Sequence, residues 1–182
     1  MKNKRMKTLN TLIVAILCLT TLVACEEKSE YRTYENGRLP YVLEVPETWE
    51  MDESNPVLIK FINAEHTIVI SCEIGEHSLI PEKHFEDFYA YLYKEHEDSL
   101  FNVETHQKTD SLYILKWKGK NDLYVFDGSK CMNGYLCGIQ VNSTPEATQE
   151  AQTIFQHVFE SLRPNPNFIA PPSIDDEDLD EE

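Results

Sequence analysis

Four segments of alternating hydrophobicity constrain the fold of this chain most strongly. They lie near residues 102–108, 111–118, 123–130 and 135–142. Thr109-Asp110, Gly119 to Asp122, and Asn133-Gly134 separate them, and all three linkers are typical of turns. Alternation with period two indicates half-buried strands, and short turns between successive strands favour hairpins. We therefore predict an antiparallel meander of four strands.

Two segments with helical periodicity flank this meander. The first runs from Pro81 to about Asp98, and the second begins at Thr144-Pro145-Glu146 and ends before Pro164. Thr144 is placed as an N-cap hydroxyl and Pro145 as the first helical residue. The apolar stripe of the first helix is Phe85, Phe88, Tyr89, Leu92 and His96, and that of the second is Ala147, Ala151, Ile154, Phe155, Val158, Phe159 and Leu162. Both stripes predict amphipathic helices.

The residues before the first helix add strands. Residues 41–50 read as a strand stopped by Pro46, with Trp49 folding back on the core, and residues 57–63 and 66–74 read as a hairpin. The order of strand, hairpin, helix, meander and helix predicts an α+β domain in which an antiparallel sheet packs with two helices. We expect one domain over residues 40–164, a polar tether over 25–39 and a disordered acidic tail over 165–182.

The N-terminus has the pattern of an export signal. Residues 1–8 are basic and residues 9–24 are apolar, which is too short for a comfortable membrane span. The run ends in Leu22-Val23-Ala24-Cys25, which resembles the lipobox of bacterial lipoproteins. That resemblance implies removal of residues 1–24, lipidation of Cys25 and anchoring in a membrane. Glu26, standing where inner-membrane retention signals carry Asp, favours the outer membrane, with the domain periplasmic or at the cell surface.

Charge limits the partners. The chain carries 16 basic and 32 acidic residues. Loss of the signal would remove four basic residues and no acid, which leaves a charge of −20 on the mature chain. Such a surface repels phosphates, so nucleic-acid binding is excluded.

Two short motifs resemble PsbP/DcrB-like domains. "YVLEVPETW" at residues 41–49 is similar to their F-x-I-x-x-P-x-x-W opening, and "IFQHVFESLRP" at residues 154–164 is similar to their last helix. The resemblance implies a sheet-and-helix sandwich. It carries no catalytic residues, because members of this fold mostly act as binding or assembly accessories.

Three cysteines, Cys72, Cys131 and Cys137, follow the lipobox. An exported domain permits a disulfide, and Cys131–Cys137 is the candidate. A three-residue loop from Asn133 would place these two residues opposite each other, whereas a two-residue type I′ turn would point them to opposite faces. Free buried thiols are the alternative, and Cys72 is expected to be a core residue.

The sequence offers few residues that could form a metal, catalytic or binding site. Glu73, His77 and His84 could form a zinc site, but their spacing matches no metal motif and solvated histidines are the plainer interpretation. We predict no catalytic residue, no metal and no cofactor. Tyr113, Trp117 and Tyr124 are a candidate binding surface, with coverage by the helices or by the tether as the alternative.

The function expected from these observations is a lipid-anchored, non-enzymatic binding or assembly accessory of the cell envelope with an envelope protein as partner. Two alternatives stay open: an immunity-type lipoprotein that binds a basic toxin, and a hydrolase whose site is assembled from distant residues.

Overall fold

The structure is a computed structural model that describes residues 30–73, 79–98, 102–119 and 122–170. Side chains of residues 93, 95–98 and 102–106 lie outside that description. A compact unit begins at Tyr31, and every element named below belongs to it. Among the described residues, no helix is long and apolar enough to cross a membrane. The apolar run at 9–24 and Cys25 precede the described part.

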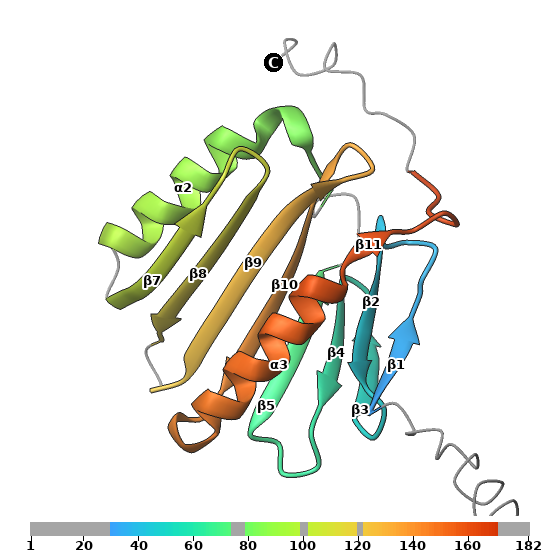
Figure 1. Ribbon diagram of the computed structural model, residues 1–182, viewed down its shortest axis with the longest axis vertical. Helices are drawn as coiled ribbons and strands as arrows, with labels where there is room; N and C mark the ends of the chain where they lie inside the picture. The colour runs from blue at the N-terminus through green and yellow to red at the C-terminus, as the bar shows by residue number, and fades with distance from the viewer. Residues whose placement is uncertain (1–29, 74–78, 99–101, 120–121, 171–182) are drawn as a thin grey trace, which may run out of the picture. The chain divides into compact units, whose positions relative to one another are not determined.

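The larger sheet follows the order β3-β4-β5-β10-β9-β8-β7, and β6 pairs with β10 beside β5. All of its pairings are antiparallel. Its strands are β3 (Glu50–Asn55), β4 (Leu58–Ile62), β5 (Ile68–Glu73), β6 (Ile80–Pro81), β7 (Asn102–Lys108), β8 (Leu112–Lys118), β9 (Tyr124–Met132) and β10 (Tyr135–Ser143). The predicted meander is thus confirmed as β7 to β10 (Figure 1).

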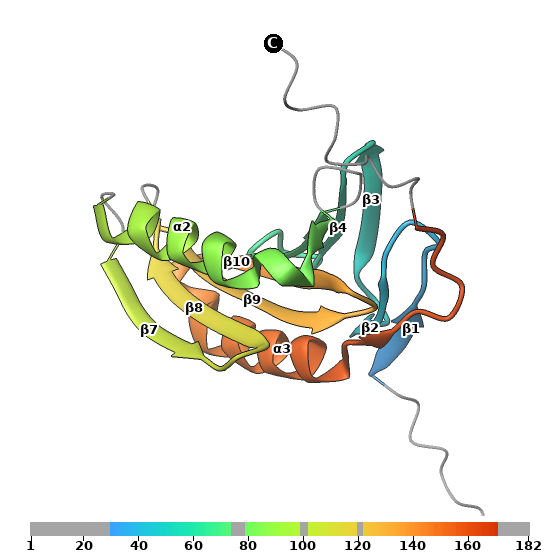
Figure 2. The ribbon, with the colours of Figure 1, turned by 90° about the horizontal axis from the view of Figure 1, so that it is seen from above.

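The two predicted helices lie on opposite sides of this sheet (Figure 2). Helix α2 (Phe85–Asp98) follows the short helix η2 (Glu82–His84), and α3 (Thr148–Ser161) follows η3 (Pro145–Ala147). Thr144 occupies the N-cap position of η3, but its hydroxyl makes no capping hydrogen bond and is buried without a partner among the described residues. Instead, the Thr148 hydroxyl donates to the Thr144 and Pro145 carbonyls, which satisfies this turn differently from the expectation.

A second, three-stranded sheet lies on the α3 side. It consists of β1 (Tyr31–Tyr34), β2 (Tyr41–Pro46) and β11 (Arg163–Pro164), in the order β1-β2-β11. Residues of β2, such as Leu43 and Val45, join one buried cluster with α3 and the facing side of the large sheet. The opposite side of the large sheet forms a smaller cluster with α2, which contains Phe85, Tyr113 and Leu115.

The ends of the domain differ from the expected boundaries. The segment expected to be a tether contains β1, and Leu39 at its end is fully buried. Asn165, expected to open the disordered tail, is 3% exposed and donates to the carbonyls of Asn36 and Leu39. The two ends of the domain therefore stabilise each other.

Candidate functional site: a pocket on the α2 face of the sheet

A pocket of about 430 Å³ opens on the face of the large sheet that carries α2. It is lined by residues of α2, of β8, β9 and β10 in the centre of the sheet, and of β4 and β5. Figure 2 shows that α2 lies over one end of the sheet, while β3 and β4 rise at the other end. The pocket thus lies where the helix leaves part of the sheet face uncovered.

The pocket floor is a polar patch created by strand register. Gln140 of β10 is paired with Ser71 of β5 on one side and with Asp127 of β9 on the other. One step further along the same face, Ser129 of β9 is paired with Tyr113 of β8. Because residues two apart in a strand share a face, all five side chains lie on the pocket side of the sheet.

Hydrogen bonds connect Tyr113, Ser129 and Gln140 with the Asp127 carboxylate. The Tyr113 hydroxyl donates to Asp127 Oδ1 at 3.3 Å, and the Ser129 hydroxyl donates to the Tyr113 oxygen at 3.1 Å. On the other side, the Gln140 side chain hydrogen-bonds Asp127, and the Asn142 amide donates to Gln140 Oε1 at 3.1 Å. Asp127 is therefore held by donors from both neighbouring strands.

Asp127 has an unusual protonation equilibrium. Burial raises the pKa of its carboxyl to about 7, although the hydrogen bonds from Tyr113 and Gln140 act in the opposite direction and the nearby Glu73 adds to the rise. Burial and the Asp127 charge also raise the pKa of Tyr113 well above its ordinary value, so that this hydroxyl stays a donor. A carboxyl that changes charge near neutral pH inside a pocket is characteristic of functional sites.

The walls of the pocket are apolar. They are formed by Leu58, Leu79, Ile80, Phe88, Leu92, Trp117 and Leu136. Along one edge, β10 pairs with β6 at residues 135–136 and with β5 at residues 140–143, and residues 137–139 between them have no described strand partner on that edge. The Tyr41 hydroxyl donates to the Gly138 carbonyl in this gap at 2.8 Å. The pocket therefore combines a polar floor with hydrophobic sides, which is the usual composition of small-molecule sites.

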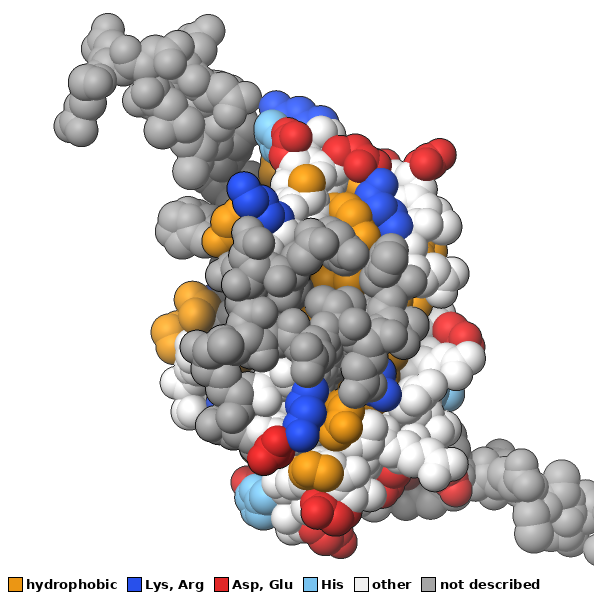
Figure 3. All heavy atoms as spheres, turned by 90° about the vertical axis from the view of Figure 1, so that its left-hand side faces the viewer, with side chains coloured by type: hydrophobic (Ala, Val, Ile, Leu, Met, Phe, Trp, Pro, Cys, Tyr) orange, Lys and Arg blue, Asp and Glu red, His pale blue; other side chains and the backbone are white. Residues whose placement is uncertain are grey.

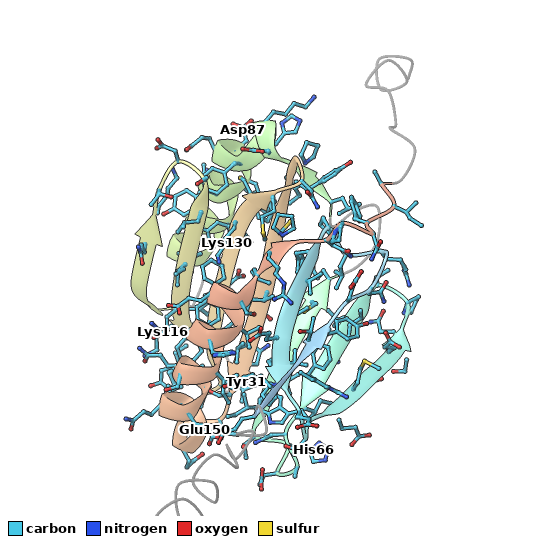
Figure 4. The ribbon with its side chains drawn as sticks, turned by 45° about the vertical axis from the view of Figure 1, so that its right-hand side comes forward. Tyr31, His66, Asp87, Lys116, Lys130 and Glu150 are labelled. Atoms are coloured by element: carbon cyan, nitrogen blue, oxygen red, sulfur yellow. The ribbon has the colours of Figure 1, made fainter. Side chains whose placement is uncertain are left out.

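The lysines of the central strands point away from this pocket. Lys116 lies over the rings of Tyr124 and Phe126, and Lys130 lies over the ring of Phe159 and donates to its carbonyl (Figure 4). All of these contacts are on the α3 side. The charged groups among the described lining residues are Asp127 and Glu73, and both are acids.

The edge of the molecule at β7 and α2 has a mixed surface chemistry. Figure 3 shows hydrophobic, acidic and basic side chains interspersed there, without one type dominating among the described residues.

The predicted aromatic surface is divided between the two sides of the sheet. Tyr113 and Trp117 share a face, but they are 2% and 5% exposed and contribute to the α2 cluster and the pocket wall. Tyr124 packs on the opposite side, against the larger cluster. Coverage by a helix, the alternative interpretation, is therefore what the structure shows for Tyr113 and Trp117.

The candidate Cys131–Cys137 disulfide is absent, and both thiols are free, as in the alternative interpretation. Asn133 and Gly134 have φ angles of 53° and 80°, as a two-residue type I′ turn requires. The resulting register places Cys131 opposite Leu136 and points the two cysteines to opposite faces. Cys72 is the core residue that its strand predicted, fully buried and free.

The candidate zinc site of Glu73, His77 and His84 is not assembled among the described residues. Glu73 is exposed at the pocket, His84 is exposed in η2, and His77 lies outside the described residues. Among the described residues, no three histidine, cysteine, aspartate or glutamate side chains are placed to hold a metal ion.

Sequence reasoning missed Asp127 and Gln140. In "YVFDGSKC" Asp127 reads as the solvent-facing position of a strand. The alternation of this strand could have indicated the position of Asp127, because residues two apart share a face and Val125, two residues earlier, is buried.

No protein-family model and no curated protein matches the sequence. Among solved structures, cyanobacterial PsbP (CyanoP) from Synechocystis sp. PCC 6803 is similar, with a TM-score of 0.54 and 13% identity, over 80% of this chain and 99% of that chain. The domain has a PsbP-like fold. The PsbP-like domain is also similar to a protein of unknown function, PA94 from Pseudomonas aeruginosa, with a TM-score of 0.45 and 15% identity, over 75% of this chain and 99% of that one. The predicted α+β sandwich is thus confirmed.

Proposed function

We propose that this protein is a lipid-anchored accessory of the bacterial cell envelope, and that its PsbP-like domain binds a ligand without catalysing a reaction. The observation that carries the binding role is the pocket over Asp127, with its polar floor and apolar walls. The lipobox-like Leu22 to Cys25 segment supports the anchor. The outer membrane, with the domain on its periplasmic or outer surface, is the proposed location.

The residues of the pocket favour binding over catalysis. A carboxyl with its pKa near 7 could serve as a general acid or base. Hydrolysis through a covalent enzyme intermediate also needs an activated nucleophile. Ser129, which lines the pocket, donates to Tyr113 and not to a base. The Cys72 thiol lies in the core cluster on the other side of the sheet, and burial raises its pKa to about 12. Neither group is activated for attack.

Membrane fractionation tests the anchor. The wild-type protein should be recovered with the membranes as a processed, lipid-modified form. The Cys25→Ser variant should stay unprocessed or be released. Normal processing and outer-membrane recovery of Cys25→Ser would overturn the anchoring proposal.

Affinity purification from the native membranes tests the accessory role. Recovery of one envelope protein with the wild-type chain, and its loss with a variant of the pocket such as Asp127→Asn, is the expected result. The matched control is Asp110→Asn, which removes the same charge from an exposed turn between β7 and β8. Equal recovery with all three chains would place partner binding elsewhere on the domain.

A second candidate is an immunity-type lipoprotein, which the charge of the mature chain favours. A surface with 32 acidic and 12 remaining basic residues suits a basic toxin. This candidate predicts tight binding to one basic protein that weakens steeply as salt is raised.

A further inference from the structure

We propose that the pocket binds a small organic cation in which an ammonium group is attached to an apolar body. The inference rests on the proposed function in taking the pocket as the ligand site, and it adds the chemical class of the ligand. The ammonium group would lie beside the Asp127 carboxylate, and the apolar body would lie along the walls.

The first argument is charge. Asp127 and Glu73 are acidic, and none of the described residues lining the pocket is a lysine, an arginine or a histidine. Lys116 of β8 and Lys130 of β9 are engaged with aromatic rings on the other side of the sheet. On the pocket side, Lys108 of β7 forms an ion pair with Glu86 of α2, and Lys60 of β4 is paired with Ser71 of β5, but neither lysine lines the pocket. A positively charged ligand is therefore the complement of this pocket, and an anion is repelled by both carboxylates.

The second argument is the energetic state of Asp127. Its ionised form has hydrogen bonds from Tyr113 and Gln140, but among the described residues it has no cationic partner to offset its desolvation. A ligand cation would supply that partner and would stabilise the charged form. Ionisation of Asp127 is thus unfavourable when the pocket holds no cation and becomes favourable when a cation is bound.

The third argument is the shape and chemistry of the walls. Phe88, Leu92 and Trp117 lie on the α2 side of the pocket, and Leu58 lies on the side of β4. Aromatic side chains near a carboxylate also attract organic cations through their ring faces. A volume of about 430 Å³ lies within the range of small-molecule pockets.

The test is a titration of the mature, lipid-anchored protein, solubilised in detergent, with 2-phenylethylammonium chloride. The neutral 2-phenylethanol and the anionic 3-phenylpropionate carry the same kind of ring and serve as comparison ligands. For probes of this size, we expect a dissociation constant of about 1 mM for the cation. Binding of the neutral probe should be at least about tenfold weaker, and the anion should be weaker still.

Asp127→Asn should reduce the affinity for the cation about tenfold or more and leave that for 2-phenylethanol within about twofold. Asp110→Asn, which removes an exposed charge that does not line the pocket, should change neither. Far-ultraviolet circular dichroism of both variants separates lost binding from lost folding, and the retained binding of 2-phenylethanol provides a second check.

The affinity for the cation should also rise between pH 6 and pH 8, because the cation binds the ionised carboxylate. The titratable groups nearest Asp127 on this side of the sheet are Tyr113 on β8 and Glu73 on β5. Further away on the same side are Lys60 on β4 and Lys108 on β7, which is ion-paired with Glu86 of α2. The described lining residues of α2, Phe88 and Leu92, are uncharged. In Asp127→Asn this rise should disappear.

Equal affinity for the cation and 2-phenylethanol would overturn the proposal. So would the absence of cation binding at about 10 mM, or full cation binding by Asp127→Asn. None of these results would affect membrane anchoring or recovery of an envelope partner, so failure of this inference is distinct from failure of the proposed function.

Discussion

The hydroxyl of Tyr113 on β8 lies 3.3 Å from Oδ1 of Asp127 on β9 and donates a hydrogen bond to it. This contact joins a phenol that α2 covers to a carboxyl group on the floor of the pocket, whose walls are apolar. The cost of ionising Asp127 there has a measurable consequence for the stability of the domain.

Asp127→Asn should change the pH dependence of unfolding. Burial raises the pKa of Asp127 from 3.8 to about 7 in the folded chain, so the folded state holds this proton more tightly than the unfolded state. Stability from this group is fully present below pH 4 and is lost as the pH rises to about 7. Chemical denaturation should show the Asp127→Asn variant to be more stable than wild type by on the order of 2–4 kcal/mol at pH 8, with little difference at pH 4. An equal difference at both pH values would contradict the raised pKa.

Gly128→Ala should destabilise the packing of α3 on the sheet. A Cβ atom at Gly128 would lie 2.8 Å from Phe155 Cζ and from Phe159 Cε2, which is closer than packed atoms tolerate. We expect a loss of about 1–3 kcal/mol in the free energy of unfolding. Gly37→Ala is the matched control, since its Cβ would meet only the Asn167 carbonyl oxygen within 4 Å, at 3.5 Å. Equal effects of the two substitutions would show that the contact with α3 is not the cause.

Asn165→Ala should show that the C-terminal segment is part of the fold. The Asn165 side chain donates to the carbonyls of Asn36 and Leu39 and accepts from the Asn167 amide. Loss of this side chain would leave buried carbonyls without these donors. We expect the free energy of unfolding to fall by about 1–3 kcal/mol. The exposed Asn167→Ala should cost much less. Thermal and urea unfolding of both variants measure this difference, and an unchanged midpoint for Asn165→Ala would contradict it.

Thiol labelling of the folded, mature protein should modify Cys131 before the other two cysteines. Cys131 is partly exposed, whereas Cys72 and Cys137 are buried and burial raises the pKa of each thiol to about 12. Mass spectrometry after a timed exposure to iodoacetamide at pH 8 gives the order of reaction. Denaturation should make all three reactive. Failure of both Cys131 and Cys137 to react after denaturation without reductant would indicate the disulfide that this register disfavours.

Most of the elements follow from local patterns in the sequence. The stripe from Ala151 to Phe159 predicted α3, and its residues are buried against the sheet. The alternation of β8 predicted that Tyr113 and Trp117 share a face, as they do. The face of each of these elements is determined by residues close together in the chain, so the sequence alone identifies it.

The elements that were missed lack such a pattern. Strand β3 has the sequence EMDESN, with hardly a hydrophobic residue, and it is a strand because it pairs with β4 at the edge of the sheet. Strand β1, with the sequence YRTY, is too short to show a clear alternation and forms by pairing with β2. Backbone hydrogen bonds to a neighbouring strand stabilise these segments, and no periodicity of their own side chains reports that neighbour.

The sequence by itself determined the α+β class, the meander, both helices and the excess of acid. Only the tertiary structure decided that Tyr113 and Trp117 are covered by α2, that Cys131 and Cys137 point apart, and that a pocket lies over Asp127. The physical reason is that burial and pKa depend on groups brought together from different strands. Tyr113, Asp127 and Gln140 acquire their shared chemistry from strand register and the covering helix, which no single segment contains.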